Sequence, residues 1–359
     1  MNSVLEGFQK LFDKAKSAPA KDRACFSLSD PSAPTFTKNQ HYLQILVNEM
    51  YLAKARQWWV EYDPVVLVVP SYIYGTQTSA VPMVVGPMLF KQYSSDIGDG
   101  SIIRNAPVTG LHPYRGGSLT LTVIFNKVQR VNNSDRMLQA LESITSVASP
   151  IAPTIPFATY LKMAGSVMGG LEILFDLPET KPVIAYRETT NPQIDQTLKP
   201  SYLVLIDAPG ITKEEQSKFK VVDSQLHYQD ESKGLIPYRQ NDFIVLQIAQ
   251  GSHRTDESVL PFYPIWLETQ RLGLQSRNVD ALWQEAKTHF NTLKVAMYES
   301  PDLIKSDIKF YYDQYFQELK DIRQGAAADA QLKAGEFALG DDYQDMQSKA
   351  KSLDELDEL

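Results

Sequence analysis

The clearest alternation of hydrophobic and polar residues lies between residues 119 and 126, directly after a Gly-Gly pair. On an extended chain the hydrophobic residues share one face and the polar residues share the other, with Leu119, Leu121, Val123 and Phe125 opposite Thr120, Thr122 and Asn126. Successive side chains of a strand point to opposite faces. The pattern therefore predicts a half-buried strand, and Ile124 is the one residue that departs from it.

Shorter hydrophobic runs, separated by Pro, Gly, Asn and Asp, predict further strands before and after this segment. They cover residues 42–52, 57–62, 65–74, 81–90, 171–177, 182–187, 201–206, 219–228 and 243–249. The polar, Gly-containing stretch 94–110 is expected to be a long loop. Strands and helices do not alternate regularly, so an α+β fold with a mostly antiparallel β-sandwich or distorted barrel as its body is favoured over a doubly wound sheet.

Hydrophobic residues at helical spacing predict an N-terminal helix, two helices inserted in the body and a C-terminal helical hairpin. These helices cover residues 3–17, 134–148, 157–171 and 278–324, and Ser300-Pro301-Asp302 interrupts the last one. We therefore divide the chain into an N-terminal amphipathic helix, a β-rich body with inserted helices, C-terminal helices and an acidic flexible tail, at residues 1–24, 25–270, 271–324 and 325–359.

The charge of the chain is concentrated at its C-terminus. The formal net charge is −8, and residues 335–359 carry eight acids against two lysines, which leaves six of the eight excess negative charges there. The rest of the chain is nearly neutral. Because a nucleic-acid-binding surface needs clustered basic residues, this distribution argues against nucleic acid as a partner.

The cysteine content and the N-terminus favour a cytoplasmic protein. Cys25 is the single cysteine, so neither an internal disulfide nor a cysteine-based zinc site is available. The first residues lack a secretory signal, and no apolar run is long enough to span a bilayer, which argues against integral membrane insertion. The helix at 3–17 has lysines on its polar face, but packing on the body or on a second copy, as in a homo-oligomer, is favoured over a membrane surface.

Standard catalytic motifs are absent from the sequence. There is no Gly-rich phosphate loop ending in Lys-Ser or Lys-Thr, no His-Glu-x-x-His and no Gly-x-Ser-x-Gly nucleophile elbow. The five histidines are isolated from one another. We therefore predict no catalytic residue, no metal ligand and no cofactor.

One repeated tripeptide suggests a ligand site. Pro-Tyr-Arg precedes two of the predicted strands. The candidate ligand-binding or anion-binding residues are therefore His112, Tyr114, Arg115, Tyr238 and Arg239. If both strands start at the same end of the body, the two arginines form a rim suited to carboxylate or phosphate. The alternative is that each tripeptide only holds its own loop in place.

Two further groups of residues support competing functions. The first hypothesis is a non-enzymatic binding or adaptor protein, whose tail docks on a basic protein partner through Leu353, Leu356 and Leu359. A tail that only increases solubility is the alternative for that segment.

The second hypothesis is a hydrolase or transferase with a site near His112 and His253, built from loops 94–117, 189–200, 228–242 and 250–258, with His253 and Asp256 as an acid–base pair. The third is a membrane-acting effector that uses residues 1–17 and 157–171.

Overall fold

The computed structural model of the chain divides into two compact units between Ser252 and His253. Each unit has a hydrophobic core of its own. The sequence placed the end of the β-rich body at residue 270, whereas the division lies before a helix that begins at Tyr263. The structure describes residues 2–17, 23–53, 56–57, 60–86, 101–129, 136, 138–141, 157–192, 198–276 and 280–337.

The first unit contains two antiparallel sheets that face each other. Sheet I has the strand order β1-β11-β15-β2-β7, with β8 paired to β2, and sheet II has the order β10-β9-β4-β3, with β5 and β6 paired to β4. The strands of sheet I are β1 (Ala24–Leu28), β11 (Ser201–Ile206), β15 (Phe243–Gly251), β2 (Tyr42–Leu52), β7 (Ser101–Pro107) and β8 (His112–Pro113). Those of sheet II are β10 (Thr180–Thr190), β9 (Leu119–Gln129), β4 (Val60–Tyr74), β3 (Arg56–Gln57), β5 (Gln77–Ala80) and β6 (Met83–Val85).

The predicted α+β fold class with mostly antiparallel sheets is confirmed. Several predicted strands nevertheless differ from the observed ones. Pro64 does not break the chain, because β4 runs continuously and pairs with β9 on both sides of this proline. The expected loop at 94–110 contains β7, which pairs with β2 and buries Ala106 although its composition is polar. The expected strand 171–177 is the end of a helix, because Leu171, Leu174 and Phe175 are buried at helical spacing.

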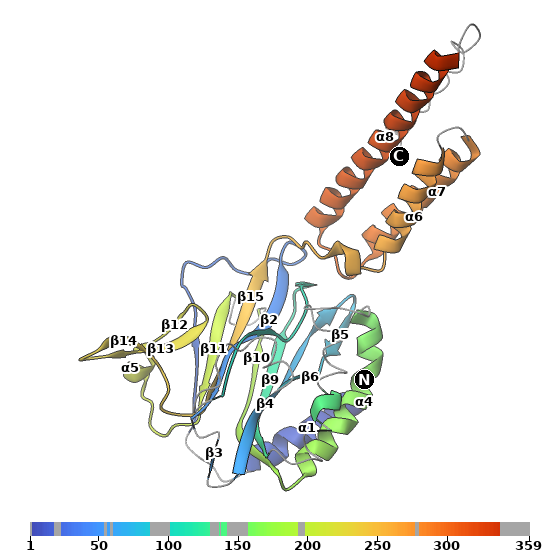
Figure 1. The fold of residues 1–359 in the computed structure, drawn as a ribbon. Helices are drawn as coiled ribbons and strands as arrows, with labels where there is room; N and C mark the ends of the chain where they lie inside the picture. The colour runs from blue at the N-terminus through green and yellow to red at the C-terminus, as the bar shows by residue number, and fades with distance from the viewer. Residues whose placement is uncertain are drawn as a thin grey trace. The chain divides into compact units, whose positions relative to one another are not determined.

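Two helices, α1 (Asn2–Ser17) and α4 (Phe157–Asp176), lie against the face of sheet II that points away from sheet I (Figure 1). This arrangement corrects the prediction that β9 is half-buried. Thr122 and Asn126, on its polar face, are each only 2% exposed, and Ile124 on the same face is also buried. The helices cover this face, so β9 is buried on both sides.

The apolar face of α1 is used inside the first unit. Leu11, Phe12 and Ala15 are buried in the core that α1 shares with α4 and sheet II. At the end of the helix, Lys14 Nζ forms an ion pair with Asp176 Oδ1 at 2.6 Å. Of the other predicted helix, 134–148, only residues 136 and 138–141 are described, and these are helical.

A small third sheet covers the outer face of sheet I. Its strands are β12 (Phe219–Val222), β13 (Gln225–Asp230) and β14 (Gly234–Pro237), preceded by the short helix α5 (Lys213–Gln216). Residues 219–228 were expected as one strand, but they form a hairpin because Asp223 and Ser224 both have positive φ angles and reverse the chain. Phe219 and Leu226 pack with Phe243 of sheet I.

The second unit is built from helices α6 (Tyr263–Gln275), α7 (Asp280–Glu299) and α8 (Lys305–Phe337), preceded by the 3-10 helix η1 (Glu257–Val259). The predicted interruption near Pro301 separates α7 from α8. Helix α6 was missed, and α8 continues past the predicted helix end at residue 324. The core contains stacked aromatic rings, among them Trp266 and Tyr315 with ring centroids 4.4 Å apart.

A buried ion pair joins the two sheets of the first unit at one end. Lys127 of β9 in sheet II pairs with Asp242, which directly precedes β15 in sheet I. The Oδ1 atom of Asp242 also accepts a hydrogen bond of 2.8 Å from the backbone N–H of Ala53. The pair therefore connects sheet II, sheet I and the end of β2.

We predict that Lys127→Met lowers the free energy of unfolding by about 3–5 kcal/mol, because it leaves the buried Asp242 carboxylate without its cation. Urea unfolding followed by circular dichroism measures the change. The double variant Lys127→Met with Asp242→Asn should recover most of the loss. In the matched control Lys218→Met, which removes an exposed ion pair with Glu231, the loss should be below about 1 kcal/mol. Equal losses in the two single variants would show that the buried pair is unimportant.

Candidate functional site

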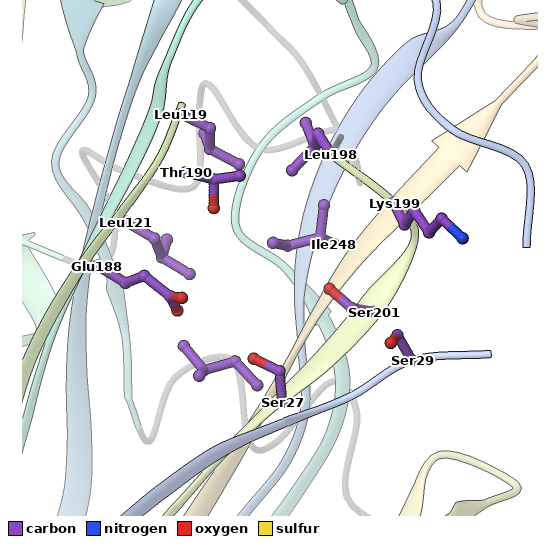
Figure 2. A pocket seen from close by; sticks show the side chains of 11 residues that line it. Ser27, Ser29, Leu119, Leu121, Glu188, Thr190, Leu198, Lys199, Ser201 and Ile248 are labelled. Carbon is purple, nitrogen blue, oxygen red and sulfur yellow. The ribbon is translucent and has the colours of Figure 1, made fainter. Parts of the chain in front are cut away.

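A cleft of about 410 Å³ opens between sheets I and II. Figure 2 shows its lining. The cleft lies at the end of the sandwich opposite Lys127 and Asp242. Its walls come from β1 and β11, from β9 and β10, and from the end of β15 with the segment before β11. The lining residues are Ser27, Ser29, Leu119, Leu121, Glu188, Thr190, Leu198, Lys199, Ser201, Leu203 and Ile248.

The lining of the cleft combines an apolar part with hydroxyl groups. On the strands the lining residues are spaced two apart, since only the inward face of each strand reaches the cleft. Leu119 and Leu121 of sheet II lie on one wall and Ile248 of sheet I lies on the other (Figure 2). Leu203 also belongs to sheet I, in β11. The hydroxyl groups come from Ser27, Ser29, Thr190 and Ser201. A cleft of this size and mixed lining suits an amphipathic ligand.

Two charged side chains line the cleft, and they are held differently. The carboxylate of Glu188 points into the cleft in Figure 2 and accepts a hydrogen bond of 2.9 Å from the hydroxyl of Tyr186. The ammonium group of Lys199 points away and donates a hydrogen bond of 2.9 Å to the carbonyl oxygen of Pro31. The negative charge of Glu188 is therefore the one directed at a ligand.

Two acidic groups near Glu188 remain protonated at neutral pH. The pKa of the Cys25 thiol is raised from 9.0 to about 11, chiefly by burial; Arg23 opposes this rise and the Glu188 carboxylate adds to it. Burial, followed by the hydrogen bond to Glu188, raises the pKa of the Tyr186 hydroxyl well above its usual value. A thiol is nucleophilic as the thiolate, so Cys25 lacks the chemistry of a covalent catalyst at this pH.

No sequence pattern predicts the cleft, although part of it falls in the loop 189–200 of the hypothetical enzyme site. Glu188 and Ser201 are ordinary strand residues, and no local motif marks them. They meet only because β10 is the edge strand of sheet II and β11 lies next to β1, the edge strand of sheet I on the same side. The alternation of residues along each strand was the one available signal, and it gives no information on which strands face each other.

The structure does not assemble the predicted anion-binding rim. His112 pairs with Leu43 at the start of β2, whereas Phe243, which follows Arg239, pairs with Tyr51 near the end of β2. Eight residues of β2 separate these positions, which corresponds to roughly 26 Å along a strand. The two Pro-Tyr-Arg segments therefore lie at opposite ends of sheet I.

The first Pro-Tyr-Arg segment packs among aromatic rings. His112 is buried, with its ring centroid 5.4 Å from that of Tyr72 and 5.8 Å from that of Tyr74. Tyr114 is also buried, and its ring contacts Phe36 with the centroids 5.5 Å apart. These contacts support the alternative interpretation, in which the segment holds its own loop in place.

Both arginines have partners within the first unit. Arg115 Nη1 donates a hydrogen bond of 2.9 Å to Asn39 Oδ1. Arg239 Nη2 lies 2.7 Å from Oε1 of Glu49, a fully buried carboxylate, and the guanidinium lies 5.1 Å from the ring centroid of Tyr51. The Arg239 charge is thus used to compensate a buried acid.

The second Pro-Tyr-Arg segment connects the third sheet to sheet I. Tyr238 packs on Phe219, and its hydroxyl donates a hydrogen bond of 2.6 Å to Asn241 Oδ1. The second oxygen of Glu49 accepts a hydrogen bond of 2.6 Å from the backbone N–H of Leu226 in β13. Glu49 of β2 therefore receives one donor from the third sheet and one from the Pro-Tyr-Arg segment, which has a structural role here.

The proposed acid–base pair of His253 and Asp256 does not form. His253 Nδ1 lies 2.5 Å from Asp307 Oδ1 near the start of α8, and Asp256 accepts two hydrogen bonds from Arg254, of 2.6 and 2.8 Å. The other oxygen of Asp307 accepts a hydrogen bond of 3.1 Å from the backbone N–H of Arg254. This network fixes the segment 253–256 to the beginning of α8.

The predicted docking leucines of the tail cannot be placed in the structure. Leu353, Leu356 and Leu359 belong to the part of the chain that the structure does not describe. Within the described ranges, no three His, Cys, Asp or Glu side chains gather as metal ligands would. Among the helices described, none has the length and apolarity that crossing a membrane requires. No protein-family model, curated protein or solved structure matches the chain.

The raised pKa of Cys25 predicts slow alkylation of its thiol in the folded chain. At pH 8 a thiol with a pKa of 9 is about 10% thiolate, whereas one with a pKa of about 11 is about 0.1% thiolate. We predict that iodoacetamide modifies Cys25 about 100-fold more slowly in the folded chain than in urea at this pH. Mass spectrometry of the alkylated peptide gives both rates. A folded rate equal to the unfolded rate would mean that the thiol is neither buried nor shifted.

Proposed function

We propose that this chain is a non-enzymatic binding protein of the cytoplasm, whose body takes a ligand in the cleft between sheets I and II and whose acidic tail engages a protein partner. The observation that carries the proposal is the lining of the cleft, where leucines from both sheets meet hydroxyl groups and the inward-pointing carboxylate of Glu188. Such a lining offers apolar contact together with a few directed polar groups, which is what a specific binding site requires.

The groups beside Glu188 support binding over covalent chemistry. The Cys25 thiol and the Tyr186 hydroxyl both keep their protons at neutral pH. Tyr186 holds the Glu188 carboxylate in place by a hydrogen bond. These groups suit recognition of a ligand by charge and hydrogen bonding, and a single half-buried free thiol fits the reducing cytoplasm.

The two alternatives drawn from the sequence have less support. His112 is buried among aromatic rings, and His253 is held by Asp307 in a network that includes the backbone of Arg254. These contacts give both histidines structural roles and lend no support to a hydrolase or transferase site. A membrane-acting role for α1 would require its apolar face, and Leu11 and Phe12 on that face are buried in the first unit.

Filling the cleft should abolish binding to the body. We predict that Ser201→Trp, which places an indole between the two walls, reduces recovery of the partner from host extract at least about tenfold, since the ring occupies space that the ligand needs. Quantitative mass spectrometry of affinity-purified full-length chain measures the recovery. The control is Ser306→Trp, which adds the same ring at an exposed position of α8. Equal recovery with both variants, with unfolding midpoints unchanged, would contradict a binding role for the cleft.

The tail is tested separately. Deletion of residues 338–359 leaves α8 intact to Phe337 and removes most of the acidic segment. We predict a loss of partner recovery on the order of tenfold. The triple variant Leu353→Ala, Leu356→Ala and Leu359→Ala, which keeps every charge, should lose as much if the leucines dock on the partner. If recovery after the deletion equals that of the intact chain, the tail is not a docking segment.

A further inference from the structure

We infer that the ligand of the cleft is an extended peptide segment of a partner protein, which pairs with the free edge of β10 and places a Lys or Arg side chain against Glu188. This inference rests on the proposed binding function and specifies the chemistry of the ligand. It follows from three features: the edge position of β10, the charge of Glu188, and the spacing of the side chains that β10 turns into the cleft.

The first feature is the backbone of β10. This strand is the last one in the order of sheet II, so one side pairs with β9 and the other side pairs with no strand among the residues described. β1, the last strand of sheet I, borders the same cleft. An edge strand offers unpaired N–H and C=O groups to an added strand. β10 spans Thr180–Thr190 and is longer than β1, which spans Ala24–Leu28, so β10 provides more of these groups.

The second feature is the charge of Glu188. Within the described part of the chain its carboxylate interacts with the hydroxyl of Tyr186, and no ion pair to a Lys or Arg is formed. Lys199, the cation that also lines the cleft, points away from it and is bonded to the carbonyl oxygen of Pro31. An opposite charge directly across from Glu188 on a neighbouring strand stabilises the pairing. Charge complementarity therefore selects a basic side chain.

The third feature is the spacing of the side chains on β10. Tyr186, Glu188 and Thr190 lie two residues apart and share the inward face of the strand. The side chains of an added strand alternate in the same way. A basic residue opposite Glu188 thus has neighbours two positions away that also face the cleft, where Leu119 and Leu121 provide apolar contact. The expected motif is a Lys or Arg with apolar residues two positions before and after it.

The charge of the chain's own tail excludes it as the occupant. Residues 335–359 carry eight acids and two lysines, which gives them the same sign of charge as Glu188. A small aliphatic amine would satisfy the carboxylate, but it has no backbone to pair with β10. The test therefore has to separate the contribution of charge from that of the peptide backbone.

The experiment is selection of 12-residue peptides from a random displayed library on the full-length chain. The bait proteins are the wild type, Glu188→Lys, and the matched control Glu214→Lys, which makes the same charge change at an exposed residue of α5. On the wild type and the control we expect enrichment of Lys or Arg flanked at two positions by apolar residues. On Glu188→Lys we expect Asp or Glu at the central position.

The best enriched peptide is then synthesised with a fluorophore, and its affinity is measured by fluorescence anisotropy. Glu188→Gln, which removes the charge but keeps the shape, should weaken binding about tenfold, and Glu214→Gln should leave it unchanged. Methylation of alternate peptide amides, which blocks pairing with a strand edge, should also weaken binding at least about tenfold. Unchanged unfolding midpoints confirm that each variant is folded.

Three results would overturn the inference. If wild type and Glu188→Lys select the same peptides, the carboxylate does not read the ligand, although a binding function still stands. If amide methylation has no effect and hexylammonium displaces the peptide, the ligand is a small amine. If no bait enriches any peptide while Ser201→Trp still loses the cellular partner, the cleft binds something other than a linear segment. If Ser201→Trp still binds both the cellular partner and the peptide, the proposed function itself is rejected.

Discussion

Burial of sheet II on both faces is the constraint on which the first unit depends. One face packs against sheet I, and the other lies under α1 and α4. Hydrophobic burial of a sheet is most favourable when both faces are removed from water, but every polar group on the covered side then needs a partner. Asn126 illustrates this requirement, because its side-chain amide donates a hydrogen bond of 3.4 Å to the carbonyl oxygen of Ile124 inside the layer.

The cleft follows from how the two sheets are joined. Lys127 and Asp242 connect them at one end, whereas β9 and β15 separate toward Leu119 and Ile248 at the other. The strands that border the opening, β1 and β10, are both at the edges of their sheets. Polar side chains are tolerated there because water still reaches them, while the leucines deeper between the sheets belong to the core. The mixed lining is therefore a consequence of where the sandwich opens.

The sequence predicts local elements well where their pattern is complete. The expected strands 42–52 and 201–206 agree with β2 and β11, and the expected helix 3–17 agrees with α1. The pattern failed at β7, whose edge position allows a polar composition, and at residues 171–177, where a run of apolar residues continues a helix. The prediction that β9 is half-buried was wrong for another reason, because the polar residues Thr122 and Asn126 lie under a layer of helices.

The candidate site was harder to predict than the fold, because it depends on pairing between distant segments. The two Pro-Tyr-Arg segments are alike in sequence, but antiparallel pairing with β2 places them at opposite ends of sheet I. The cleft instead unites Ser27, Glu188, Ser201 and Ile248, which come from four strands. No spacing in the sequence brings these residues together, and only the strand order of both sheets does.

Two carboxylates of the first unit show why a ligand of positive charge is expected. Glu49 is fully buried, and the protein supplies its compensation through Arg239 and the backbone N–H of Leu226. Glu188 receives one hydrogen bond from Tyr186 and otherwise depends on the water that enters the open cleft. A ligand that fills the cleft removes this water, and a carboxylate without water or a cation is costly. Apolar and acidic ligands would leave the desolvation cost of the Glu188 carboxylate uncompensated, whereas a basic side chain would compensate it. Glu188 therefore discriminates between ligands when a ligand closes the cleft to solvent.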